Sequence, residues 1–198
     1  MSANTIEHNR KKYDFSGVES VWLFGYGSLI YKVDFPFLEQ RPASIRGWER
    51  RFWQGSHDHR GTPESPGRVV TLIEKPDAVC KGMAFRVSPK VFEHLDVREK
   101  NGYLRLNITL TFNDGSHAEG LVYIATEDNE AFLGHAPDAD IARQIASASG
   151  PSGPNAEYLL RLAESLRALG ADCPHTFAIE SHLKSVAKNG TQRRQNVK

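Results

Sequence analysis

The order of the predicted elements constrains the fold of this chain more than any single residue does. Strand-like segments separated by turns occupy residues 21–126, and one short helix, beginning near Ser88 and Pro89, interrupts them. From Asp138 onward, apolar residues recur at helical spacing instead. Strands that come first and helices that come last, without βαβ alternation, are typical of an α+β fold.

Six segments have the composition or the alternation of strands, and they begin near residues 21, 45, 68, 80, 103 and 117. In the clearest of them, Tyr103 and Arg105 lie on one face while Leu104 and Leu106 lie on the other, as in a half-buried strand. Several segments also contain glycines that can mark bends. We therefore expect a small antiparallel β-barrel of about six strands with packed helices.

The last third of the chain predicts three helices. The first carries an apolar stripe of Ile141, Ile145 and Ala148. The second is expected to have Asn155 as its N-cap and to end at Gly170. The third is expected to span residues 173–188.

Polar residues flank this predicted domain, which we place at residues 20–188. Residues 1–19 lack the apolar core of a secretory signal, so we expect a flexible N-terminal extension. Residues 189–198 form a polar, basic tail that is expected to fray. The sequence assigns no function to either end, and it does not determine an oligomeric state.

The composition excludes several classes of function. A net charge of +1 argues against a general nucleic-acid or membrane surface, and no apolar run is long enough to span a bilayer. The two cysteines, Cys80 and Cys173, have no metal-binding spacing and are expected to be reduced thiols in a cytoplasmic protein. His57 and His59 form a His-x-His pair, but no second pair of ligands supports a metal site.

An apolar run ends in a Gly-rich turn at residues 21–30, VWLFGYGSLI. Glycine at positions 25 and 27 can adopt a positive φ and lets a ligand approach the backbone closely. Such a loop can direct several N–H groups at one anionic centre. A substrate cradle and a plain hairpin turn are both compatible with this pattern. Ser28 lacks the G-x-S-x-G context of a nucleophile, and no third glycine completes a dinucleotide fingerprint.

Glu99 is the strongest candidate for acid–base chemistry. It follows the short apolar helix and precedes the turn at Asn101-Gly102, where the chain enters a buried strand. Burial there would raise the pKa of the carboxyl group, and neighbouring Arg98 and Lys100 would lower it. The alternative is that Glu99 belongs to a solvated run of charges.

Several segments occur together and in one order: VWLFGYGSLI at 21–30, KVDFP at 32–36, RRFWQGS at 50–56, DHRG at 58–61, PGRVVTL at 66–72, REKNGY at 98–103 and GPSGPNAEYL at 150–159. The chain resembles the ChaC family, the glutathione-specific γ-glutamylcyclotransferases, from about residue 21 to residue 183. One departure is Asn101-Gly102, where family members often carry two glycines. Because asparagine tolerates the left-handed conformation, the turn is expected to survive.

The resemblance implies a γ-glutamylcyclotransferase-like fold and a reaction that converts glutathione to 5-oxoproline and cysteinylglycine. It implies that Glu99 is the general acid and base, with no cofactor or metal. The expected substrate-binding residues are Leu23, Phe24, Gly25, Tyr26, Gly27, Ser28 and Leu29. Tyr158 either adds a hydroxyl group to the cleft or packs in the core. Two alternatives stay open, a cyclotransferase for other γ-glutamyl amines or dipeptides and a non-catalytic γ-glutamyl-binding module.

Overall fold

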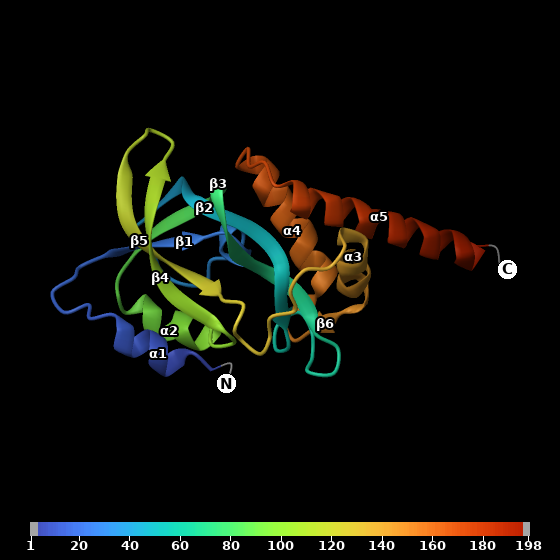
Figure 1. Cartoon of the computed structure of the whole chain (residues 1–198), viewed down its shortest axis with the longest axis horizontal. Helices are drawn as coiled ribbons and strands as arrows, with labels where there is room; N and C mark the ends of the chain where they lie inside the picture. Colours follow the sequence, from blue (N-terminus) through green and yellow to red (C-terminus); the bar gives the residue numbers. More distant parts are fainter. Residues whose placement is uncertain (1–3, 196–198) are drawn as a thin grey trace.

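A closed β-barrel forms one part of the molecule, and helices pack against it at two places (Figure 1). The computed structural model describes residues 4–195, with side chains described as far as Val186. The barrel has five strands in the spatial order β1-β3-β2-β4-β5. They are β1 (Val21–Gly25), β2 (Glu39–Ser56), β3 (Gly67–Val87), β4 (Tyr103–Phe112) and β5 (His117–Ala125).

The helices form two groups (Figure 1). Two helices lie side by side below the barrel in this view, and they are α1 (Ile6–Lys12) and α2 (Val91–Arg98). Three others gather at the opposite end, and they are α3 (Asp138–Ser147), α4 (Asn155–Ala168) and α5 (Pro174–Gln195). The short elements are the 3₁₀-helix η1 (Ser28–Ile30) and the two-residue strands β6 (Ser149–Gly150) and β7 (Gly153–Pro154). The α+β prediction is therefore confirmed.

The predicted count of about six strands is one too many for the barrel. The segments that begin near residues 68 and 80 are two parts of one strand, β3, which pairs with β2 on both sides of a register shift. Glu74 pairs with Trp48, and Val79 pairs with Arg46. The 18-residue β2 is long enough to pair with both parts, so the polar residues between them do not separate two strands.

The barrel is also mixed rather than wholly antiparallel. Its neighbouring strands are antiparallel except for β1 and β5, which run parallel with Leu23 beside Leu121. The reason is one of parity, because strand directions cannot alternate completely around a closed ring of five. One parallel pair is required, and here it involves the strand that leads into the Gly-rich loop.

Strand β1 separates two apolar clusters because its side chains alternate in direction. Phe24 faces the larger cluster, which includes Leu110 of the barrel and Leu159 of α4. Leu23 faces the smaller cluster, which includes Leu95 of α2. The side chains of Leu23 and Phe24 are both nearly inaccessible to solvent, so the end of β1 is fixed from two directions.

The ends of the domain differ from the predictions. Residues 4–19, expected to be a flexible extension, contain α1, and its Asn9 is fully buried. The predicted boundary at residue 188 falls inside α5, which continues to Gln195. The end of the predicted tail, residues 196–198, lies outside the described residues. Within residues 4–195, no helix is long and apolar enough to cross a membrane.

Asn155 was expected to cap α4, and this prediction is wrong. Pro154 precedes the helix, and the buried Asn155 side chain bonds to β3 instead. It accepts a hydrogen bond from the Arg68 N–H at 2.7 Å and donates one to the Arg68 carbonyl at 2.8 Å. The start of α4 is thereby fixed against the barrel, which determines where Tyr158, one turn later, lies.

Candidate active site

Two adjoining cavities meet at Glu99. The outer cleft has a volume of about 430 Å³, and the inner cavity beside the Gly-rich loop has a volume of about 60 Å³. Four residues line both of them: Ser28, Glu99, Tyr103 and Tyr158. A ligand that extends through both cavities would therefore pass the Glu99 carboxylate where they join.

The loop at residues 25–29 forms one wall of the inner cavity, and we call it the cradle. Neither Gly25 nor Gly27 adopts the positive φ that glycine permits. Their small size is needed instead. A Cβ atom at Gly27 would lie 2.9 Å from Val70 Cγ2 and 3.0 Å from the Tyr158 hydroxyl, and one at Gly25 would lie 2.7 Å from Leu29 Cβ.

Buried side chains hold the cradle backbone from the core side. The guanidinium of Arg50, which is 5% exposed, donates through Nε to the Tyr26 carbonyl at 2.6 Å and through Nη2 to the Lys81 carbonyl at 2.7 Å. The Tyr26 hydroxyl donates to the Tyr123 carbonyl at 2.7 Å. Among the described residues, no acceptor is bonded to the backbone N–H groups of Gly27, Ser28 and Leu29. These groups are therefore available to an anion.

Glu99 lies at the C-terminal cap of α2, with its backbone N–H bonded to the Leu95 carbonyl at 2.8 Å. Burial of the carboxyl group raises its pKa above the ordinary value. The charges of Arg98 and His59 oppose this shift, while those of Asp34 and Asp58 add to it. A carboxyl group with a raised pKa, placed at the junction of two cavities, is suited to proton transfer.

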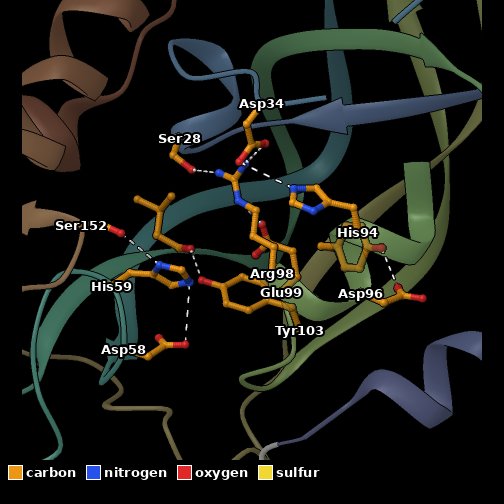
Figure 2. Close-up of polar contacts among 12 residues, drawn as sticks. Ser28, Asp34, Asp58, His59, His94, Asp96, Arg98, Glu99, Tyr103 and Ser152 are labelled. Atoms are coloured by element: carbon orange, nitrogen blue, oxygen red, sulfur yellow. Dashed lines mark hydrogen bonds and ion pairs between the residues drawn. The ribbon is translucent and has the colours of Figure 1, made fainter. Parts of the chain in front are cut away.

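Arg98 connects Glu99 to the cradle (Figure 2). Its guanidinium lies 3.2 Å (Nε to Oε1) from the Glu99 carboxylate, and it donates to the Ser28 hydroxyl at 2.8 Å. A third contact, 2.6 Å from Nη1 to Oδ1, joins it to Asp34. One cation thus fixes the position of Ser28 relative to Glu99.

Two phenol groups line the junction. Burial raises the pKa of both Tyr103 and Tyr158, so both are neutral donors at neutral pH. The Tyr103 hydroxyl donates to the Val70 carbonyl at 2.9 Å (Figure 2). The Tyr158 hydroxyl accepts from the Val70 N–H at 3.3 Å, and no acceptor for its own proton is found among residues 4–195. Tyr158 can therefore donate to a ligand as well as pack in the core.

The outer cleft is lined by charged and polar side chains. His59 contacts the Ser152 hydroxyl at 3.2 Å and Asp58 at 3.7 Å (Figure 2). Lys32 and Lys100 contribute two cations to its wall. No group of three or more His, Cys, Asp or Glu side chains within the described part of the chain could hold a metal ion. Cys80 and Cys173 are both free and buried.

The structure brings together eight of the nine residues expected at the site. Glu99 and Tyr158 line the inner cavity with Phe24, Gly25, Tyr26, Gly27, Ser28 and Leu29. The exception is Leu23, which is fully buried in the smaller apolar cluster and lines neither cavity.

Sequence reasoning missed Arg98 and Tyr103 as parts of the site. The sequence shows Arg98 only as a neighbour that would lower the pKa of Glu99, and nothing in it indicates that Arg98 reaches Ser28. For Tyr103, the sequence predicts only a position on one face of a half-buried strand. Asn101 and Gly102 do form a turn, in which Gly102, at φ +88°, has the positive φ and Asn101 does not.

Alignments with known proteins of similar sequence cover most of this chain. A zebrafish (Danio rerio) glutathione-specific γ-glutamylcyclotransferase 1 is 46% identical over 85% of this chain and 91% of its own length. The γ-glutamylcyclotransferase 2-3 of Arabidopsis thaliana is 43% identical over 84% of this chain and 90% of its own length.

A solved structure gives the same fold. The crystal structure of a yeast γ-glutamyl cyclotransferase specific to glutathione superposes with a TM-score of 0.78 at 32% identity, covering 84% of this chain and 96% of the yeast chain. The family model for ChaC-like proteins matches residues 21–189, which contain the cradle, Glu99 and Tyr158. The chain therefore belongs to the ChaC family.

Proposed function

We propose that this protein is a glutathione-specific γ-glutamylcyclotransferase, and that Glu99 moves the proton in its reaction. The observation that carries this proposal is the position of Glu99, a carboxyl group of raised pKa where the inner cavity opens into the outer cleft. The family relationship and the relatives' names support the same activity.

The γ-glutamyl group of the substrate is proposed to occupy the inner cavity. The free N–H groups of Gly27, Ser28 and Leu29 would bind the α-carboxylate or the oxyanion that develops on the γ-carbonyl. The Tyr158 hydroxyl is the candidate donor to the other of these two groups. A cavity this narrow would fold the γ-glutamyl chain back on itself, which brings its α-amine close to its γ-carbonyl.

The reaction needs one proton acceptor that later becomes a donor. Ionised Glu99 takes a proton from the α-ammonium group, and the free amine attacks the γ-carbonyl to form the five-membered ring. Protonated Glu99 then gives its proton to the leaving nitrogen of cysteinylglycine as the carbon–nitrogen bond breaks. The remaining extra proton on the ring nitrogen passes through the ionised Glu99 to the released amine, which departs as an ammonium group. The products are 5-oxoproline and cysteinylglycine, and no side chain forms a covalent bond to the substrate.

The outer cleft is proposed to hold the cysteinylglycine part of glutathione. Lys32 and Lys100 on its wall suit the carboxylate at the glycine end, which shorter γ-glutamyl amines lack. The substrate is thus a small molecule. We place the reaction in the cytoplasm, a proposal supported by the two free, buried cysteines.

The test is release of 5-oxoproline by the purified protein from glutathione, oxidised glutathione and γ-glutamyl dipeptides, assayed in parallel. The Glu99→Gln variant should reduce kcat for glutathione by about 10²–10⁴-fold, the usual contribution of a general base. Glu93→Gln, which changes an exposed carboxylate of the same helix, is the matched control and should retain full activity.

Full turnover by Glu99→Gln would contradict the mechanism. Faster turnover of γ-glutamyl dipeptides than of glutathione would favour the broader cyclotransferase. A wild-type protein that binds but does not convert any of these substrates would be a γ-glutamyl-binding module.

A further inference from the structure

The N-terminal segment lies outside the part of the chain that matches the family, yet it contacts α2 and β4, the two elements on either side of Glu99. Residues 4–20 precede the family match, which begins at residue 21. In the structure, residues 5–15 run along α2 and the beginning of β4 (Figure 1). We call residues 5–15 the N-terminal clamp.

The first contacts of the clamp are with the turn that follows Glu99. The Thr5 backbone N–H donates to the Lys100 carbonyl at 3.0 Å, and the Thr5 hydroxyl lies 3.2 Å from the same oxygen. That hydroxyl is also 2.8 Å from the Tyr103 carbonyl. One residue of the clamp therefore holds the carbonyls at both ends of the Lys100–Tyr103 turn.

Asn9 makes the second set of contacts and is fully buried. Its amide nitrogen donates to the Tyr103 carbonyl at 3.0 Å, and its amide oxygen accepts from the Arg105 N–H at 2.9 Å. This is the hydrogen-bonding pattern of a neighbouring strand, supplied by one side chain. Asn9 can fill this place because β2 pairs with β4 only near the C-terminal end of β4, at Thr111 and Phe112.

The clamp also packs against α2, on the other side of Glu99. Phe15 stacks on Phe92 of α2, with ring centroids 5.1 Å apart. The guanidinium of Arg105 lies over the rings of Tyr13, Phe15 and Phe92, with its Cζ 5.0–5.4 Å from each centroid. Its Nε is 3.3 Å from Oδ1 of Asp96, which is three residues before Glu99 in the sequence.

This contact explains why one expectation for β4 was wrong. Strand alternation placed Arg105 on the polar face of a half-buried strand, but Arg105 is 1% exposed because the clamp covers it. A charged side chain is seldom buried unless its hydrogen bonds and charge are matched. The Arg105 guanidinium donates to the Asn9 carbonyl and forms an ion pair with Asp96, while its Nη1 has no hydrogen-bond partner among the described residues. The polar contacts that partly offset its burial therefore come from the clamp and α2.

We propose that the N-terminal clamp, through Thr5 and Asn9, is a positioning element that holds the Glu99 carboxylate in its productive place. It fixes both elements that flank Glu99, the end of α2 and the start of β4, and neither residue reaches the substrate cavities. This inference rests on the proposed function of Glu99. Displacement of a catalytic group by about 1 Å can reduce turnover about 100-fold, so the positioning has a measurable effect.

The test compares Asn9→Ala and Thr5→Val with Glu7→Ala, an exposed position on the same helix, all in the full-length chain. Asn9→Ala should lower kcat for glutathione at least about tenfold while KM changes less than about twofold, because the cradle that binds substrate is untouched. Thr5→Val should have a smaller effect in the same direction. Glu7→Ala should match the wild-type protein.

Amide hydrogen exchange provides a readout that does not depend on activity. In Asn9→Ala, the amides of residues 99–105 should exchange faster while those of β3 keep their wild-type protection, which also establishes that the variant is folded. Faster local exchange with unchanged kcat would overturn the proposal and leave the clamp a purely structural element. Unchanged local exchange would overturn it as well.

These outcomes remain distinct from failure of the proposed function. If the wild-type protein turned over no γ-glutamyl substrate, the cyclotransferase assignment would fail. The exchange of residues 99–105 would then still decide whether the clamp orders the Glu99 turn. If Asn9→Ala lost protection throughout β3, Thr5→Val, which keeps every buried side-chain contact of Asn9, would decide the question.

Discussion

The cradle and the Glu99 turn face each other across the inner cavity, but different kinds of anchor hold them. The cradle is fixed from within the domain by Arg50, by Arg98 and by close packing of Gly27 against Tyr158. The Glu99 turn is held within the domain by Gln54, which donates to the Asn101 carbonyl at 3.2 Å, and it is held in addition from outside the family region by Thr5 and Asn9. A substitution near the cradle should therefore affect binding, and one near the turn should affect proton transfer.

Gly27→Val should produce the largest loss on the cradle side. The added Cβ would lie within 3.0 Å of Val70 and Tyr158, so the loop must shift and its free N–H groups must move. We expect kcat/KM for glutathione to fall at least about 100-fold, mainly through KM. Gly27→Ala, which adds the Cβ alone, should lose less. Steady-state kinetics of both variants check this, and unchanged KM and kcat in Gly27→Val would remove the cradle role.

Arg98→Met should affect both sides, because Arg98 joins them. The cation lowers the Glu99 pKa, so its loss lets burial raise that pKa further. Since Glu99 must be ionised to accept a proton, the acid limb of the kcat profile should move to higher pH. Loss of the bond to Ser28 should also lower kcat/KM, by about tenfold.

Asp34→Asn should shift the acid limb of the same kcat profile in the opposite direction. Asp34 raises the Glu99 pKa, so neutralising it should move the acid limb to lower pH. His59 and Asp58 also act on Glu99 and stay unchanged in both variants. If both variants shifted the limb in the same direction, the limb would not report the ionisation of Glu99.

Tyr158→Phe should have a smaller effect and separates its two possible roles. We expect kcat/KM to fall about fivefold, equivalent to about 1 kcal/mol for one lost hydrogen bond to the ligand. The thermal midpoint should fall only slightly, because the ring and its packing remain. A lower midpoint with unchanged kinetics would indicate that Tyr158 serves only the core.

The smallest expected effect is a gain in stability when Glu99 is neutralised. Burial raises the pKa of Glu99, so folding with this group ionised is disfavoured, and that cost is present above the raised pKa. Glu99→Gln should therefore raise the midpoint at pH 8 by about 2–4 °C, or about 1 kcal/mol for a chain of this size. The difference should vanish below about pH 4, where Glu99 is protonated in both states. A lower midpoint at pH 8 would mean that the contact with Arg98 outweighs burial.

The position of the cradle loop could be predicted because its signal is local. An apolar run, two glycines and a serine are contiguous, and the resemblance paired them with Glu99 and Tyr158. Prediction from the sequence failed where a distant segment of the chain packs against a regularly patterned strand. Alternation placed Arg105 on the open face of a strand, but residues 5–15 cover that face. Likewise, no local pattern distinguishes one long bent strand from two short ones, so β3 was divided.

The parallel pairing of β1 with β5 has a consequence for how the protein is made. Tyr26 and its acceptor Tyr123 are 97 residues apart in the chain, and Val70 and Tyr158 are 88 apart. Contacts between such distant residues form slowly, because closing long loops costs chain entropy before the contacts stabilise them. During synthesis from the N-terminus, the cradle strand leaves the ribosome long before its partner strand β5 exists. The cradle, which lies within the first thirty residues, is therefore among the last parts of the molecule to take shape, and an unfinished chain lacks the completed inner cavity.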